Sequence, residues 1–258
     1  MEHAEIYGLP EIYEIAFSYR DIGKECDFLA DVYRMATGQS PTSVLELACG
    51  PAVHAREFAR RGLGVTALDI SPEMAEYAAG KLGAEASVLV ADMADFAVPE
   101  PVDLAFTLID SLPYLRTNEQ LVSHLGSVRR SLREDGVYVV ELRHPADAHP
   151  RADRGPMDQW TVERDGLRVT TEWGFEVTYD PLAQTEHVRS RITVQGGGEP
   201  RVIESSGTLR PLLPQEFLLL VACAGGWRFL GWWGAFDLSR PLGGSEQDWR
   251  MIIGLQRA

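Results

Sequence analysis

SVLELACGPAVHAR, residues 43–56, is the stretch that decides the fold. An apolar run leads past the carboxylate of Glu46 into a turn of small residues, and helical spacing then continues through Phe58 and Ala59. A run that is apolar on both faces is typical of a central parallel strand covered by helices, and Pro51 suits a first helical turn. The stretch therefore predicts a strand that feeds a helix amino terminus, where backbone N–H groups can approach a nucleotide-like ligand.

This segment resembles motif I of the class I S-adenosylmethionine-dependent methyltransferases, in which an acidic residue is followed by small residues at alternate positions. The pattern is carried here by Glu46, Ala48, Gly50 and Ala52, so alanine replaces two of the usual three glycines. Each added methyl narrows the approach of backbone to ligand. Taken alone, the segment also fits an ordinary strand, turn and helix without a ligand.

Two further strands are predicted at residues 64–70 and 86–93, and each has an acidic residue next to its carboxyl end, Asp69 in the first and Asp92 in the second. A carboxylate about 20 residues beyond the turn can accept both ribose hydroxyls of an adenosine, in a nicotinamide cofactor as well as in a methyl donor. The resemblance implies that Asp92 takes the adenine amino group and that Met93 packs on the ring. Buried strand ends have no structural need for carboxylates, so three in succession favour a nucleotide site.

A dinucleotide site fits less well, because residues 50–55 lack the G-x-G-x-x-G fingerprint and such a site has no use for Asp92. The expected cofactor is S-adenosyl-L-methionine, with S-adenosyl-L-homocysteine as its product and no metal. The resemblance implies a set of donor-binding residues spread along the first half of the chain, namely Tyr13, Glu46, Ala48, Gly50, Asp69, Ile70, Met74, Asp92, Met93 and Leu108.

Composition narrows the class of protein further. The 258 residues are enough for one large α/β domain, with or without an insertion. A formal net charge of −14 argues against a nucleic-acid substrate, since such binding needs Lys and Arg against phosphates. No signal peptide or membrane-spanning run is evident, and Cys26, Cys49 and Cys223 are scattered singly, which supports neither a disulfide framework nor a zinc site. We expect a cytoplasmic protein without a membrane partner.

The amino-terminal residues 6–35 show apolar side chains at helical spacing, which predicts a stripe that faces the core and includes Tyr19, with a break near residues 21–23. Residues 11–14 (EIYE) resemble the helix opening of bacterial sugar-amine and antibiotic N-methyltransferases, whose amino-terminal helices fold over the cofactor. By that resemblance Tyr13 is a candidate for contact with the methyl donor and for catalysis. The alternative for Tyr13 is a core-packing aromatic on a helix stripe.

Two further candidates follow the fourth and fifth predicted strands, residues 102–110 and 137–142. Asp110 ends the fourth strand, where an acid could pair with a cationic amine acceptor or, alternatively, cap the next helical turn. His144 follows the fifth strand, at the edge where open α/β sheets bind ligands. Because its imidazole titrates near neutrality it is the best general-base candidate, although a lone His also serves structural roles.

From residue 156 to 210 the apolar period changes from helical to two, and turn signals divide the segment into four antiparallel strands. We predict a donor-binding domain formed by residues 1–155 and 211–258, with residues 156–210 inserted as an antiparallel sheet. The last helix is expected at residues 214–224, followed by a closing pair of strands at 227–236 and 249–255. The inserted sheet is expected to cover the acceptor cleft or to form a homo-oligomer interface.

The predicted fold is α/β: a Rossmann-like class I methyltransferase fold with a seven-stranded, mostly parallel sheet, helices on both faces, and an inserted antiparallel sheet. The implied function is methyl transfer to a small metabolite, foremost the nitrogen of an amine in secondary metabolism such as antibiotic biosynthesis. An amine needs only to be unprotonated, whereas a hydroxyl or carbon acceptor needs a base in contact. O- or C-methylation, and donor binding without methyl transfer in a regulatory or cyclase-like module, stay open as alternatives.

Overall fold

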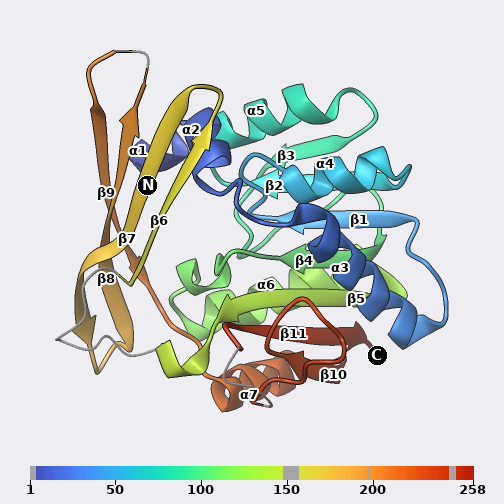
Figure 1. Ribbon diagram of the computed structural model, residues 1–258. Helices are drawn as coiled ribbons and strands as arrows, with labels where there is room; N and C mark the ends of the chain where they lie inside the picture. Colours follow the sequence, from blue (N-terminus) through green and yellow to red (C-terminus); the bar gives the residue numbers. More distant parts are fainter. Residues whose placement is uncertain (1–3, 148–156, 197, 244–247) are drawn as a thin grey trace.

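A computed structural model describes residues 4–147, 157–196, 198–243 and 248–258, which form two β-sheets with helices around the larger one (Figure 1). The main sheet has seven strands in the order β10-β11-β5-β4-β1-β2-β3. All its neighbouring pairs are parallel except those made by β11. The strands are β1 (Ser43–Leu47), β2 (Gly64–Asp69), β3 (Ser87–Val90), β4 (Val102–Thr107), β5 (Leu132–Arg143), β10 (Trp227–Trp233) and β11 (Arg250–Arg257). This is the predicted fold class.

The order of the strands places a ligand crevice between β1 and β4. From β1 the chain proceeds outward to β2 and β3, then returns to β4 on the other side. In open α/β sheets, ligands bind beyond the carboxyl ends of the strands at such a reversal. Both strands are buried along nearly their whole length, as their continuous apolar sequence predicted.

Helices cover both faces of the main sheet (Figure 1). On one face α3 (Ile22–Thr37), α4 (Val53–Arg60) and α5 (Pro72–Leu82) share a hydrophobic core with the sheet. On the other face α6 (Asn118–Ser131) and α7 (Pro214–Ala224) form a second core. Ser71 caps α5, because its hydroxyl accepts the Met74 N–H at 3.2 Å. No described helix has the length and apolar character to cross a membrane.

The amino-terminal residues form two short helices, α1 (Ala4–Tyr7) and α2 (Pro10–Ala16), ahead of α3. The predicted interruption is found just before α3, where the carboxylate of Asp21 caps the helix by accepting the Lys24 N–H. Tyr19 lies in the interruption and is 47% exposed, so its expected place on a buried stripe is wrong. The stripe fails there because residues outside a helix no longer follow its period.

The inserted sheet has four antiparallel strands, β6 (Asp158–Arg164), β7 (Leu167–Asp180), β8 (Thr185–Gln195) and β9 (Arg201–Leu209). Its apolar side chains form a third core with α1 and α2, including Ile6, Val169 and Ile192. Figure 1 shows the sheet (yellow to orange) beside the carboxyl ends of the main strands, with α1 and α2 between the two sheets.

The expected alternation along β7 is interrupted near its middle. The pairing with β8 shifts between Glu172 and Glu176, so three residues of β7 lie opposite one residue of β8. Gly174, at the centre, has a φ of 62° and donates its N–H to the Ser190 hydroxyl. The predicted period of two along residues 167–179 is therefore wrong at Trp173 and Phe175, because the extra residues of the bulge re-aim the side chains within it. The alternation resumes beyond the bulge, where Val177 pairs with Val188.

Candidate active site

A first cavity of about 260 Å³ lies at the carboxyl ends of β1 and β4. Its walls come from the turn after β1, from α2, from α4 and from the loop after β4. Five of the residues expected to bind the donor line it, namely Tyr13, Glu46, Ala48, Gly50 and Leu108. The structure thus brings these five together at the crevice that the strand order predicts.

The turn after β1 is held in an unusual backbone conformation. Ala48, Gly50 and Ala52 have φ values of 51°, 50° and 54°, all in the left-handed region. That region costs an L-residue other than glycine about 1–2 kcal/mol. The two alanines retain the glycine-like backbone of the motif, and strain of this kind is characteristic of ligand-binding turns. The ring of Tyr13 lies over the turn, since a Cβ placed on Gly50 would be 3.8 Å from its Cε1 atom.

Asp69 is attached to the same turn from the end of β2. Its carboxylate accepts the Gly50 N–H at 2.8 Å and the Ser71 N–H at 2.9 Å. Burial raises the pKa of Asp69, and the backbone N–H groups partly oppose that rise. Each carboxylate oxygen has two lone pairs, so both oxygens can also accept hydroxyl groups of a ribose. Asp69 is not among the described residues that line the first cavity.

The residues expected around the adenine lie farther along the same edge, outside the described lining of that cavity. Ile70 is 50% exposed, and Val90, which pairs with Asp69 across β2 and β3, is 60% exposed. These two exposed side chains, at the adjacent ends of β2 and β3, are named the apolar shelf. Asp92 is exposed and accepts the Ala94 N–H at 2.8 Å.

Met74 and Met93, two further residues expected to bind the donor, are both buried. The carbonyl oxygen of Met93 is 2.7 Å from Nδ1 of His124. The sulfur of Met74 would lie 4.0 Å from a Cβ on Gly50, so it supports the turn from the side of α5. Their side chains can therefore shape the binding edge through packing.

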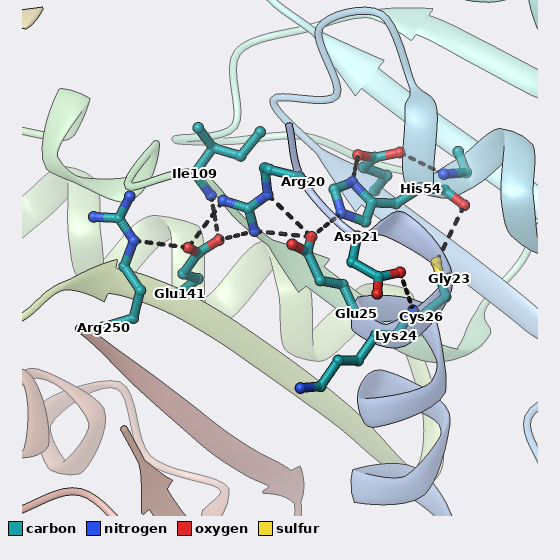
Figure 2. Close-up of polar contacts among 12 residues, drawn as sticks. Arg20, Asp21, Gly23, Lys24, Glu25, Cys26, His54, Ile109, Glu141 and Arg250 are labelled. Carbon is teal, nitrogen blue, oxygen red and sulfur yellow. Dashed lines mark hydrogen bonds and ion pairs between the residues drawn. The ribbon is translucent and has the colours of Figure 1, made fainter. Parts of the chain in front are cut away.

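Glu46 is engaged with the start of α4. One carboxylate oxygen accepts the Ala55 N–H at 2.8 Å, and the other lies 3.4 Å from Nδ1 of His54. The second ring nitrogen of His54 is 2.6 Å from a carboxylate oxygen of Glu25 (Figure 2). Burial lowers the pKa of His54, but the hydrogen bonds to Glu25 and Glu46 outweigh it and leave the pKa raised. Glu46 thus fixes the turn to the helix.

Arg20 extends this buried chain of charges to Glu141 of β5 (Figure 2). Its guanidinium group lies 2.9 Å from Glu25 and 2.8 Å from Glu141. Glu141 also pairs with Arg250 at 3.1 Å and accepts the Ile109 N–H at 2.8 Å. Burial alone would raise the pKa of Glu141, but Arg20 and Arg250 lower it to about 2.

Sequence reasoning missed this network. Arg20 and Glu141 are far apart in the chain, and their pairing depends on the folded sheet. One signal was available, because Glu141 interrupts the apolar run of the fifth strand. A charge in a strand covered on both faces needs a partner.

A second cavity, of about 800 Å³, lies between the inserted sheet and the main sheet. It shares four lining residues with the first cavity: Tyr13, Phe17, Ile109 and Ser111. The Tyr13 ring stacks on Phe17 with centroids 4.4 Å apart. Burial raises the pKa of Tyr13 well above its ordinary value, which keeps the phenol neutral. Tyr13 therefore stands between the two cavities.

The other two catalytic candidates differ in position. Asp110 lines the second cavity, and its carboxylate accepts the Arg143 N–H at 3.0 Å and pairs with the guanidinium of that residue at 3.4 Å. Ser111, not Asp110, is the N-cap of the short helix η1 (Leu112–Tyr114), so the capping alternative was wrong. Nδ1 of His144 accepts the Ala146 N–H at 3.2 Å, and His144 is not among the described lining of either cavity.

Comparisons with known proteins identify similar chains. Residues 44–136 match the model of a family described as a methyltransferase domain. The chain is 28% identical to the dTDP-3-amino-3,4,6-trideoxy-alpha-D-glucopyranose N,N-dimethyltransferase of Streptomyces venezuelae over an alignment of 141 residues. This alignment covers 55% of this chain and 57% of that protein. The sequence match thus spans little more than half of that relative.

Two solved structures resemble the chain over nearly its whole length. Streptomyces venezuelae DesVI aligns with a TM-score of 0.77 at 22% identity, covering 100% of this chain and 99% of that one. SAM-bound CalS10 of Micromonospora echinaspora, described as an amino pentose methyltransferase, aligns with a TM-score of 0.75 at 21% identity, covering 96% and 97%. The likeness extends to the inserted sheet and concerns the fold.

Proposed function

We propose that this chain, whose residues 44–136 match a methyltransferase-domain family, is a class I S-adenosylmethionine-dependent methyltransferase that methylates the nitrogen of a small-molecule amine in secondary metabolism. The observation that carries the proposal is the junction of the two cavities. A strained donor-type turn opens on one side of Tyr13, and a larger cavity opens on the other. Such a junction would hold a donor and an acceptor side by side in one site, the arrangement that methyl transfer requires.

The cofactor would supply an activated methyl group on a sulfonium sulfur. The residues present fit such a cofactor, because the left-handed turn, the Asp69 carboxylate and the apolar shelf at Ile70 lie along one edge. In our assignment Asp69 binds the ribose, and Ile70, Asp92 and Met93 surround the adenine. Glu46 and Met74 position the turn, and Ala48, Gly50 and Leu108 border the methionine part.

An amine acceptor agrees with the positions of the candidate bases. Attack by an amine forms the N–C bond as the C–S bond breaks, and the new ammonium group then releases its proton to water. A hydroxyl or carbon acceptor needs a base in contact. Asp110 is already bound by Arg143, and His144 lies outside the described cavity lining. O- or C-methylation and donor binding without turnover remain the alternatives.

The inserted sheet supports a role as a lid. Its apolar side chains make contacts within this chain: they pack on α1 and α2 and line the second cavity. Residues 156–210 are then the acceptor-covering insertion, and residues 1–155 and 211–258 the donor-binding domain. A reducing compartment such as the cytoplasm agrees with three free cysteines. A homo-oligomer through the sheet is the alternative to the lid.

The test is a transfer assay with donor labelled at its methyl group and a pool of small amines, analysed by mass spectrometry. The expected product carries the label on nitrogen. Label on oxygen or carbon would instead show that the protein is an O- or C-methyltransferase. Donor binding by calorimetry with no labelled product from any acceptor would support the binding-module alternative and overturn the proposal.

A further inference from the structure

A buried chain of three hydrogen bonds ties the loop after β3 to the centre of the main sheet. The carbonyl oxygen of Met93 lies 2.7 Å from Nδ1 of His124 on α6. Nε2 of the same ring lies 2.7 Å from the Tyr138 hydroxyl, which in turn lies 2.7 Å from the Thr107 hydroxyl at the end of β4. The side chains of His124, Tyr138 and Thr107 are fully buried. Methyl transfer as proposed does not use this imidazole.

The chemistry of its members gives the chain one direction. A carbonyl oxygen only accepts, so Nδ1 of His124 carries a hydrogen and donates to Met93. Burial lowers the pKa of His124 to about 4, although the hydrogen bond to Met93 and the charge of Asp92 act to raise it. The ring is therefore neutral near pH 7, and Nε2 accepts from the Tyr138 hydroxyl, which accepts from Thr107 in turn. A buried network with every member paired is rigid.

Asp92 lies between two anchored residues of this loop. On one side Ala91 donates its N–H to the carbonyl oxygen of Asp69 at 2.9 Å. On the other side Met93 accepts from His124. In our assignment the carboxylates of Asp69 and Asp92 bind the ribose and the 6-amino group of the adenine. The two anchors therefore set the distance between the ribose contact and the purine contact.

We propose that His124 is a positioning residue for the purine of the methyl donor, an inference that rests on the proposed function. Its N–H holds the main chain at Met93, so that the adjacent Asp92 is placed to accept the adenine amino group. Because its side chain is fully buried, His124 acts through the loop and not by contact with the donor. Its loss should weaken recognition of the purine and leave the transfer step unchanged.

Two substitutions separate the two hydrogen bonds of the imidazole ring. In His124→Asn the amide nitrogen is bonded to Cγ, as Nδ1 is, so it can still donate to Met93. In His124→Gln the longer side chain places its amide oxygen near the position of Nε2, where it can accept from Tyr138 while the bond to Met93 is lost. Both variants put an amide in the same buried space, and only the first keeps the anchor of the loop.

The measured quantity is the preference for S-adenosyl-L-homocysteine over the analogue with hydrogen in place of the 6-amino group, by calorimetry. A hydrogen bond to a charged group corresponds to a factor of about ten or more in affinity. Wild type and His124→Asn should therefore prefer the adenine ligand at least about tenfold, and in His124→Gln the preference should fall to about threefold or less. Val128→Ala is the control, because Val128 is buried on α6 about one turn beyond His124. It should keep the preference.

Methyl transfer from labelled donor gives a second measurement. His124→Gln should raise the donor KM about tenfold and keep kcat within about twofold, the pattern of a lost binding contact. If circular dichroism shows that this variant does not fold, His124→Phe removes the same N–H donor and carries the same expectation. The inference is overturned by a full preference in the variant that lacks the N–H donor, by an equal loss in His124→Asn or Val128→Ala, or by no preference in wild type.

Binding by the wild type separates this inference from the proposed function. If the wild type does not bind S-adenosyl-L-homocysteine, the donor site is refuted and the proposed function with it. If the wild type binds it and methylates an amine while His124→Gln keeps the full purine preference, the proposed function stands and the role of His124 is refuted.

Discussion

Glu141 offers the sharpest test of how the crevice is held together. Its side chain is fully buried and lies between the guanidinium groups of Arg20 and Arg250. These lower its pKa from the ordinary 4.5 to about 2. At roughly 1.4 kcal/mol for each pKa unit, the difference corresponds to about 3 kcal/mol of stability at neutral pH. Loss of one partner from a buried ion pair costs a similar amount, about 3–5 kcal/mol.

Glu141→Gln keeps the shape of the side chain and removes its charge. We expect the free energy of unfolding at pH 7, measured by urea titration with circular dichroism, to fall by about 3 kcal/mol. A folded-state pKa below the unfolded value stabilises the protein above about pH 4.5, and that stabilisation is lost as the pH falls toward 2. The difference in free energy of unfolding between wild type and variant should therefore become smaller as the pH falls from about 4.5 to 2.

Glu57→Gln is the matched control, because Glu57 pairs with Arg60 and Arg61 on the surface of α4. Exposed ion pairs contribute about 0–1 kcal/mol, so this variant should stay within about 1 kcal/mol of wild type. The reasoning about Glu141 is refuted if Glu141→Gln is as stable as the control at pH 7. A gap that does not change between pH 4.5 and 2 would also refute it.

Four smaller changes test the assignments around the crevice. Asp69→Asn should raise the Kd for S-adenosyl-L-homocysteine at least tenfold by calorimetry, since hydrogen bonds to a charged group contribute about 1.5–3 kcal/mol; an unchanged Kd removes the ribose role. Tyr13→Ala should lower kcat/KM for the amine at least tenfold by opening the wall between the cavities, and a value within twofold of wild type contradicts this. Ala48→Gly should raise the free energy of unfolding by roughly 0.5–1 kcal/mol, because relief of left-handed strain exceeds the added entropy of the unfolded chain; no gain in a urea titration counts against that strain. His144→Gln should leave kcat within threefold for an amine acceptor, whereas a hundredfold loss would restore His144 as a general base.

The sequence predicts most of the fold because its signals are local. Strands β1, β2 and β4 are continuous apolar runs, and Ser71 with Pro72 marks the start of α5. The inserted sheet was predicted from its period of two. The bulge at Gly174 was missed, although a glycine inside such a pattern is a known sign of one.

The positions of residues in the candidate site were predictable near the motif and not where distant residues meet. Residues 48–50 and Tyr13 lie together as the resemblance implies. The pairing of Arg20 with Glu141, and the left-handed backbone of Ile109 and Asp110, arise only when the loop after β4 reaches the end of β5. The charge of Glu141 inside an apolar strand signals that a partner is needed, but the sequence does not identify Arg20 as that partner. The backbone conformation of Ile109 and Asp110 has no signal in the neighbouring sequence.

Under the proposed role of the inserted sheet as a lid over the acceptor, its shared core with the amino-terminal helices bears on how acceptor preference could be exchanged between proteins of this fold. Because Ile6 and Ala16 pack against Val169 and Ile192, the sheet does not have a complete hydrophobic core of its own. A recombined chain that takes residues 158–209 from another enzyme would place unmatched side chains against α1 and α2. An exchange of acceptor specificity should therefore include residues 4–16 together with the inserted sheet, because those residues complete the hydrophobic core of the sheet.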